Sequence, residues 1–259
     1  MSAQSHIELV SNRALLSQVE KDSIATSIST LKTRLNSYYG ANLSEQLQFG
    51  SSTRGTILPR EMDSRSDIDY LIVFCDEEAK PQTYINRLKR FAEKYYTSSQ
   101  ITQSHPTIVL SLNHIKFDLV AARVGFFSEY KIPAPSSTYS EWTTTSPKEF
   151  NTQLSDKNKD CSYKFKPAIR VLKYWNARSG YVFDSYSLEQ WCADQYYFMC
   201  YSTKDYFYSM IEKLSLDWGS AQWRKDKVDR AKQIVANAKQ YDSDSMPVSA
   251  EQEIKKLVP

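Results

Sequence analysis

Two aspartates at the start of an apolar run are the first chemical signal in this chain. Asp67 and Asp69 flank Ile68 and lead into β-branched and aromatic residues, which predict a buried strand over 68–74. Residues i and i+2 of a strand project from the same face, so both carboxylates would face the same way. A solvated strand face is the alternative, but carboxylates buried without a partner are costly. Because such a pair repels unless a cation lies between its members, it predicts a site for a hard divalent ion such as Mg²⁺.

A third carboxylate lies in a second apolar run. Asp118 interrupts the sequence from Lys116 to Val120, where an edge-strand acid paired with a lysine is the plain alternative. Beside the Asp67–Asp69 pair, Asp118 is better interpreted as a third metal ligand on a neighbouring strand. Three carboxylates can hold two Mg²⁺ ions, or Mn²⁺ in their place, about 4 Å apart. One ion would activate an attacking hydroxyl, and the other would bind a triphosphate and stabilise departing pyrophosphate.

A glycine–serine turn precedes these acids. The chain has six glycines, and two of them fall between Phe49 and Thr56. Glycine lets the backbone approach a ligand closely, and free amides and hydroxyls suit phosphate oxygens, although an ordinary tight turn is the alternative. Among the arginines of this region, Arg54 is favoured over Arg60 and Arg65 because it lies in the turn. The candidate phosphate contacts are Gly50, Ser51, Ser52 and Arg54.

These motifs together resemble the signature of the polymerase-β-like nucleotidyltransferases. They span residues 49–121, and the fifteen residues between Ser51 and Asp67 form a long connection for that pattern. The resemblance implies transfer of a nucleoside monophosphate from a nucleoside triphosphate to a hydroxyl, with release of pyrophosphate. It implies that Asp67 and Asp69 hold both metals, and that Asp118 ligates the catalytic metal and assists deprotonation of the acceptor. Ser51 and the turn amides would hold the phosphates.

The second half of the chain narrows the resemblance. A Lys-Tyr-Trp helix over 166–176, followed by Ser-Tyr-x-Leu-Glu at 185–189, is similar to the helical domain of oligoadenylate synthases, cyclic GMP-AMP synthase and the bacterial CD-NTases. That resemblance implies that Lys173 and Ser185 bind the donor triphosphate and that Tyr186 stacks on the base. A cation, a hydroxyl donor and a π-face suit those tasks. A solvated helix lysine and a core tyrosine are the alternatives for Lys173 and Tyr186. The zinc-binding insertion of the animal cyclic GMP-AMP synthase is absent from the sequence.

The elements that must position these residues follow from periodicity. Apolar spacing predicts a long helix over 8–38, a helix over 82–96 and a hairpin of strands at 107–112 and 115–121, whereas 126–146 is expected to be loop. Further helices are predicted at about 147–155, 165–178, 187–201, 204–215, 221–240 and 249–257. The fold class is α+β. A nucleotidyltransferase core with a small mixed sheet and a long N-terminal helix (1–146) precedes a helical domain that closes the active-site cleft (147–259).

Composition bounds the other possibilities. The chain has 259 residues, a formal net charge of +3 and 24% charged residues, which is typical of a globular protein. No apolar run is long enough to span a membrane, and no signal peptide is evident, so we expect a cytoplasmic protein without a membrane partner. The four cysteines and three histidines form no zinc-type cluster. The mixed-charge run 223–232 is interpreted as a solvated helix face, with a groove for a nucleic-acid product or acceptor as the alternative.

The expected activity is template-independent joining of nucleoside triphosphates, ATP among them, into a cyclic or linear oligonucleotide signal. From the resemblance alone, we expect this signal to act in bacterial defence against phage through a separate effector protein. One alternative is a toxin-like or drug-modifying transferase that nucleotidylates a protein, tRNA or small molecule. Another alternative is an inactive nucleotide or RNA sensor, although all three carboxylates are retained.

Overall fold

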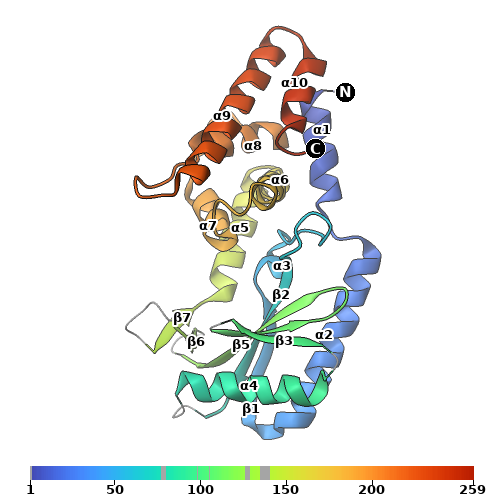
Figure 1. Ribbon diagram of the computed structural model, residues 1–259, viewed down its shortest axis with the longest axis vertical. Helices are drawn as coiled ribbons and strands as arrows, with labels where there is room; N and C mark the ends of the chain where they lie inside the picture. Colours follow the sequence, from blue (N-terminus) through green and yellow to red (C-terminus); the bar gives the residue numbers. More distant parts are fainter. Residues whose placement is uncertain (1, 77–79, 98, 105, 126–128, 135–140) are drawn as a thin grey trace. The chain divides into compact units, whose positions relative to one another are not determined.

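The computed structural model of the chain describes residues 2–76, 80–97, 99–104, 106–125, 129–134 and 141–259 (Figure 1). The chain forms two compact units, and each is assembled from separate stretches of sequence. The sheet unit comprises Ser17–Gly55 and Arg65–Asn151, and the helical unit comprises Met1–Leu16, Thr56–Ser64 and Thr152–Pro259. The functional division after residue 146 stays a prediction.

Among the described residues, the sheet unit contains seven strands in one mixed sheet. The strand order is β1-β2-β5-β4-β3, and β6 and β7 extend from β5. The β2–β5 pair is parallel and the other pairs are antiparallel, which confirms the predicted hairpin of β4 and β5. The strands are β1 (Leu43–Phe49), β2 (Asp67–Phe74), β3 (Gln100–Ser104), β4 (Thr107–Ser111), β5 (Lys116–Val124), β6 (Tyr130–Pro133) and β7 (Trp142–Thr145).

The residues of β2 alternate between two faces of the sheet. Phe74 lies on one face and contacts Tyr39 and Tyr84 through its ring. Leu71 and Val73 lie on the opposite face, in a buried cluster with Val120, Ala122 and Tyr130. Because the side-chain period of a strand is two, Asp67 and Asp69 share the face of Leu71 and Val73.

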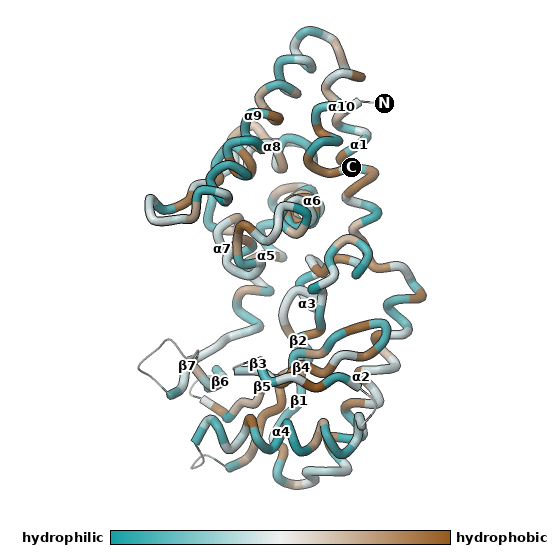
Figure 2. Tube along the Cα trace, in the orientation of Figure 1, coloured by the Kyte–Doolittle hydropathy of each residue, from teal (hydrophilic) through white to brown (hydrophobic). Residues whose placement is uncertain are grey.

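Two helices of the sheet unit lie against the first of these faces. They are α2 (Gln18–Tyr39) and α4 (Pro81–Tyr95), which contact each other and the strands. The buried residues of α4, among them Ile85, Leu88 and Phe91, recur at helical spacing, and Figure 2 shows hydrophilic and hydrophobic bands along this helix. A short 3₁₀ helix η1 (Gly40–Asn42) joins α2 to β1, and a single turn α3 (Ser51–Arg54) follows β1.

Two predictions about this region were wrong. The helix expected over 8–38 is two helices, α1 (Ala3–Arg13) and α2, because Ser17 starts a new helix by forming a capping box with Glu20. The segment 126–146, expected to be loop, contributes β6 and β7, although residues 126–128 and 135–140 lie outside the described part. Apolar residues of β6 and the β-branched run of β7 supply strand propensity that the neighbouring prolines and serines obscured.

The helical unit gathers segments from both ends of the chain. Helix α1 contacts α6, α8 and α10, and the His6 ring Nε2 lies 2.7 Å from the carbonyl oxygen of Val258. Among the described residues, no helix is both long and apolar enough to cross a membrane. The later helices are α5 (Pro147–Asp160), which begins in the sheet unit, then α6 (Phe165–Arg178), α7 (Ser185–Asp194), α8 (Thr203–Lys213), α9 (Gln222–Ser243) and α10 (Pro247–Lys255).

Candidate active site

Strand register brings the three predicted aspartates onto one face of the sheet unit. Strands β2 and β5 run parallel, with Asp69 directly opposite Asp118 and Asp67 directly opposite Lys116. Residues paired in register project from the same face, and so do residues i and i+2 of each strand. Asp67, Asp69 and Asp118 therefore point to one side, and Lys116 shares it.

Gly50 leaves the space that the Asp69 carboxylate occupies. Phe49, the last residue of β1, pairs with Asp69, and the chain then turns at Gly50 with φ of +73°. A Cβ atom at Gly50 would lie 1.7 Å from Asp69 Oδ2. Any side chain at residue 50 would thus collide with the carboxylate, so the position of Asp69 depends on the glycine at residue 50.

The short helix α3 carries the hydroxyl groups of the turn. The Ser52 hydroxyl donates to the carbonyl of Phe49 at 3.0 Å and accepts from the Gln48 side-chain amide at 2.9 Å. The Thr53 hydroxyl donates to the carbonyl of Gly50 at 3.0 Å. Ser51, at the first helical position, is half-buried. The side chains of Ser52 and Thr53 hence hold the turn in shape, and the contacts of Ser51 and Ser52 with a phosphate stay predictions.

Arg54 has a packing role in this structure. Its side chain is 5% exposed, and its guanidinium lies 5.1 Å from the ring centroid of Phe150. Asn151, the next residue of α5, donates from its side chain to the Thr53 hydroxyl at 3.0 Å. These contacts fasten α3 to the start of α5 within the sheet unit. In this structure the Arg54 guanidinium is largely buried and already stacked on Phe150, which limits its reach toward a phosphate. The phosphate contact of Arg54 stays a prediction.

Burial shapes the electrostatics of the carboxylate face. Desolvation raises the pKa of the Asp118 carboxyl above its ordinary range, and the nearby charge of Lys116 opposes that shift. A cation bound beside Asp118 would favour the ionised form that burial disfavours. The paired carboxylates and the cradle at Gly50 therefore fit a divalent ion.

The protein side chains supply only part of a metal site. Among the described residues, no group of three or more His, Cys, Asp or Glu side chains is arranged so that it could hold a metal ion by itself. Mg²⁺ in nucleotide-using enzymes is often held by one or two carboxylates, with substrate phosphates and water supplying the remaining ligands. The register pair Asp69 and Asp118 matches that smaller share, and the metal ligands stay a prediction.

The helical unit contains a second charged cluster, in which Lys173 is already paired. Lys173 is 5% exposed, and its ammonium donates to Glu189 Oε1 at 2.7 Å. The hydroxyl of Thr56 donates to the other carboxylate oxygen of Glu189 at 2.9 Å. All three residues are buried. Their network fastens the Thr56–Ser64 segment to α6 and α7, and the proposed contact of Lys173 with a triphosphate is untested.

The other two predicted nucleotide contacts lie at the start of α7. Ser185 is its first residue and is half-buried, while Tyr186 is 46% exposed. The preceding residue, Asp184, caps the helix by accepting from the amide of Ser187 at 2.8 Å. An exposed tyrosine face suits base stacking, whereas the capping carboxylate adds negative charge where a phosphate would approach.

Sequence reasoning did not single out the partners of Lys173. Glu189 closes the Ser-Tyr-x-Leu-Glu run, and Thr56 follows the glycine–serine turn, so both stood beside motifs that were recognised. The available signal was chemical, because a lysine and a glutamate that both fall among apolar helix positions need partners when buried. The hydrogen bond from Tyr181 to Asp63 Oδ1, at 2.6 Å, was missed in the same way.

Comparison with known proteins places the chain in a family. Residues 1–158, more than half of the chain, match the family model described as Second Messenger Oligonucleotide or Dinucleotide Synthetase domain (SMODS). A search of curated proteins gives no match.

Solved structures share the fold over almost the whole chain. A structure of E. coli MS115-1 CdnC with ATP has 14% identity and a TM-score of 0.71, covering 98% of this chain and 97% of that one. The Bradyrhizobium diazoefficiens CD-NTase CdnG in complex with GTP has 9% identity and a TM-score of 0.68, covering 98% of both chains. Vibrio cholerae DncV cyclic AMP-GMP synthase, in complex with the linear intermediate 5′ pppA(3′,5′)pG, has 12% identity and a TM-score of 0.65, covering 100% and 82%. At these identities the structures support the fold, and the family match supports the activity: the chain belongs to the Second Messenger Oligonucleotide or Dinucleotide Synthetase family of nucleotidyltransferases.

Proposed function

We propose that this enzyme joins nucleoside triphosphates, without a template, into a cyclic or linear oligonucleotide signal and releases pyrophosphate. Asp67, Asp69 and Asp118 would hold two Mg²⁺ ions, for which Mn²⁺ could substitute. The signal would act in bacterial defence against phage through a separate effector protein. CdnC and CdnG, the relatives solved with ATP and GTP, support a purine nucleoside triphosphate as one substrate.

One observation carries this proposal. Asp69 and Asp118 are register partners on adjacent parallel strands, and the Asp69 carboxylate fills the space left by the missing side chain of Gly50. A surface acid has no need of such a cradle. A carboxylate held in one position beside the glycine–serine turn suits an in-line phosphoryl transfer, because its catalysis depends on positioning and charge.

Each residue has a chemical task in the transfer. The acceptor hydroxyl oxygen bonds to the α-phosphorus of the donor as the bond from that phosphorus to the bridging oxygen of pyrophosphate breaks. Asp118 accepts the hydroxyl proton at its carboxylate. Bound divalent ions would supply Lewis-acid stabilisation of the phosphate charges. Ser51 and the amides of α3 orient the donor phosphates.

The test is product analysis with purified protein. Each labelled ribonucleoside and deoxyribonucleoside triphosphate, alone and in mixtures, is incubated with Mg²⁺ and then Mn²⁺, and products are resolved by mass before and after phosphatase. We expect pyrophosphate release together with either phosphatase-resistant small species, which are cyclic, or a ladder, which is linear. Asp69→Asn should abolish product, whereas Asp229→Asn, which alters an exposed aspartate of α9, should not.

Other outcomes select the alternatives. Label transferred to an added protein, tRNA or small molecule, without free oligonucleotide, would indicate a transferase that modifies such acceptors. Tight nucleotide binding without pyrophosphate release under any condition would indicate an inactive sensor. Product formation by Asp69→Asn at the wild-type rate would overturn the assignment of this carboxylate.

A further inference from the structure

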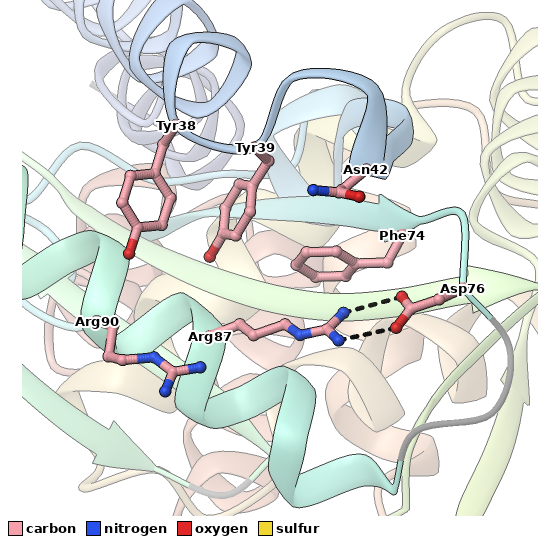
Figure 3. Close-up of a pocket in the computed structure, with 7 residues that line it drawn as sticks. All are labelled: Tyr38, Tyr39, Asn42, Phe74, Asp76, Arg87 and Arg90. Carbon is pink, nitrogen blue, oxygen red and sulfur yellow. Dashed lines mark hydrogen bonds and ion pairs between the residues drawn. The ribbon is translucent and has the colours of Figure 1, made fainter.

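A pocket of about 270 Å³ lies in the sheet unit on the side of β2 opposite the carboxylates. It is lined by Tyr38, Tyr39, Asn42, Phe74, Asp76, Arg87 and Arg90 (Figure 3). Phe74 is the last residue of β2, five positions after Asp69, which places it about 17 Å along the strand. Since five is an odd number, its side chain projects from the other face. The pocket is thus separate from the candidate active site.

The side chain of Arg87, which lines this pocket, is held in one position by its neighbours. Its two terminal nitrogens lie 2.9 and 2.8 Å from the two carboxylate oxygens of Asp76, a bidentate pairing visible in Figure 3. The guanidinium also lies 5.5 Å from the ring centroid of Phe74 and 5.2 Å from that of Tyr84. This pairing lowers the pKa of the Asp76 carboxyl. An arginine held on two rings and a carboxylate presents a flat, pre-organised surface, with its charge already balanced.

Arg90 adds a positive charge that is not balanced within the pocket. It follows Arg87 by three positions on α4, so both side chains lie on the same side of the helix. Among the described residues no ion pair to Arg90 is recorded. With Arg87 offset by Asp76, the described lining residues carry one net positive charge, which favours a ligand with an anionic group.

Aromatic rings and a buried hydroxyl complete the lining. Tyr39 makes edge contacts with Tyr38 at 4.8 Å and with Phe74 at 5.1 Å between ring centroids. The hydroxyls of Tyr38 and Tyr39 point toward the side of the pocket where Arg87 and Arg90 lie (Figure 3). The Tyr39 hydroxyl is buried and has no hydrogen-bond partner in the described part of the chain. Burial raises its pKa, so it stays protonated and able to donate.

We propose that this pocket binds a nucleoside monophosphate at a site separate from the catalytic carboxylates. The phosphate would meet Arg90 first. The Tyr39 hydroxyl, which is closed off from solvent in this structure, would gain the acceptor it lacks when the lining adjusts to the ligand. The planar base would stack against the tyrosine rings and the Arg87 guanidinium, within reach of the Asn42 amide. The volume lies just below the range of about 300–1,000 Å³ for small-molecule sites, which favours one nucleotide over an oligonucleotide. The inference does not depend on the proposed reaction.

Calorimetric titration with AMP, GMP, CMP and UMP, in EDTA to exclude metal-dependent binding, tests this inference. Adenosine and inorganic phosphate are titrated separately, to divide the contributions of base and phosphate. We expect at least one monophosphate to bind, with affinity lowered at least tenfold in Arg90→Ala and several-fold in Tyr39→Phe. Lys89→Ala, which removes a neighbouring exposed cation of α4 outside the lining, should bind as wild type does. Asp69→Asn should leave this binding intact.

Several results would overturn the inference. They are failure of every monophosphate to bind at millimolar concentration, wild-type affinity in both Arg90→Ala and Tyr39→Phe, and loss of binding in Asp69→Asn alone. Phosphate binding as tightly as AMP would remove the role of the base. Thermal unfolding of each variant without ligand separates weak binding from misfolding, and Tyr39→Phe keeps the ring packing.

Discussion

The carboxylate face of the sheet unit and the Lys173 cluster of the helical unit treat charge in opposite ways. On the sheet, two aspartates from adjacent strands face the same side in register, so like charges accumulate at one place. In the helical unit, the ammonium of Lys173 meets the carboxylate of Glu189 at 2.7 Å, and both are buried. Opposite charges that neutralise each other inside a unit need no added ion, whereas gathered like charges repel unless an ion lies between them. The paired charges of the helical unit therefore point to a structural role, and the gathered carboxylates of the sheet unit point to chemistry.

Removing a carboxylate from the sheet should have the largest effect. Asp69→Asn keeps the shape of the side chain but removes its charge, and the loss of several kcal/mol of transition-state stabilisation lowers the rate by several orders of magnitude. Pyrophosphate release measures the rate, and circular dichroism shows whether the fold is retained. A rate within tenfold of wild type would mean that the face is not catalytic.

Breaking the Lys173–Glu189 ion pair should lower the free energy of unfolding more than it lowers the reaction rate. Lys173→Met leaves Glu189 buried without its cation, which costs about 3–5 kcal/mol of unfolding free energy. The double variant Lys173→Met with Glu189→Leu should recover most of that loss, because neither buried charge remains. Urea unfolding measures both variants.

A matched control is available for that pair. Lys239 and Glu212 form an ion pair of the same length, 2.7 Å, but both side chains are largely exposed. Lys239→Met should therefore cost no more than about 1 kcal/mol. If the stable double variant bound nucleoside triphosphate much more weakly than wild type, Lys173 would contact the triphosphate. The Lys173–Glu189 pair would then serve the reaction as well as the fold.

Filling the cradle at residue 50 tests how strictly the carboxylate is placed. Gly50→Ala brings a Cβ to 1.7 Å from Asp69 Oδ2 and should lower the rate about 100-fold, since displacements near 1 Å cost that much. Gly55→Ala is the control for a positive φ, because Gly55 has φ of +72° and an added Cβ there meets no atom within 4 Å. Its ψ of 27° is easier for alanine to adopt than the −157° of Gly50, so part of any difference between the variants reflects backbone strain. Equal loss of activity in both variants would attribute the effect to backbone strain instead of the carboxylate.

The same contrast explains what the sequence could predict. The period of two that places Asp67 and Asp69 on one face is a local property, and it identified the strand correctly, whereas the chemistry of the pair stays a prediction. The opposition of Asp69 and Asp118 is a matter of register between strands about 50 residues apart. The sequence indicated a neighbouring strand from the type of residue at 118, but it did not give the register. The Lys173 network depends on Thr56, and long-range contacts of this kind leave no local pattern. Missing β6 and β7 had a simpler cause, because prolines and serines outweighed their short apolar stretches.

The smallest expected effect concerns the pH dependence of stability without metal. Burial raises the pKa of Asp118 above its ordinary value of 3.8, so the folded state favours the protonated form more than the unfolded chain does. Its contribution to stability is fully present below about pH 4 and is lost as the pH rises through the folded-state pKa. Asp118→Asn should therefore match wild type near pH 4 and be the more stable of the two at pH 7.

Thermal unfolding in EDTA between pH 4 and pH 7 measures this difference, with Asp229→Asn as the exposed control that should show no such trend. Adding Mg²⁺ at pH 7 should narrow the gap between wild type and Asp118→Asn, because an ion bound to the ionised carboxylate stabilises only the wild-type folded state. A gap that stayed constant with pH would show that Lys116 cancels the effect of burial. In that case the carboxylate face would resemble the Lys173 cluster, with its charge compensated from within the protein.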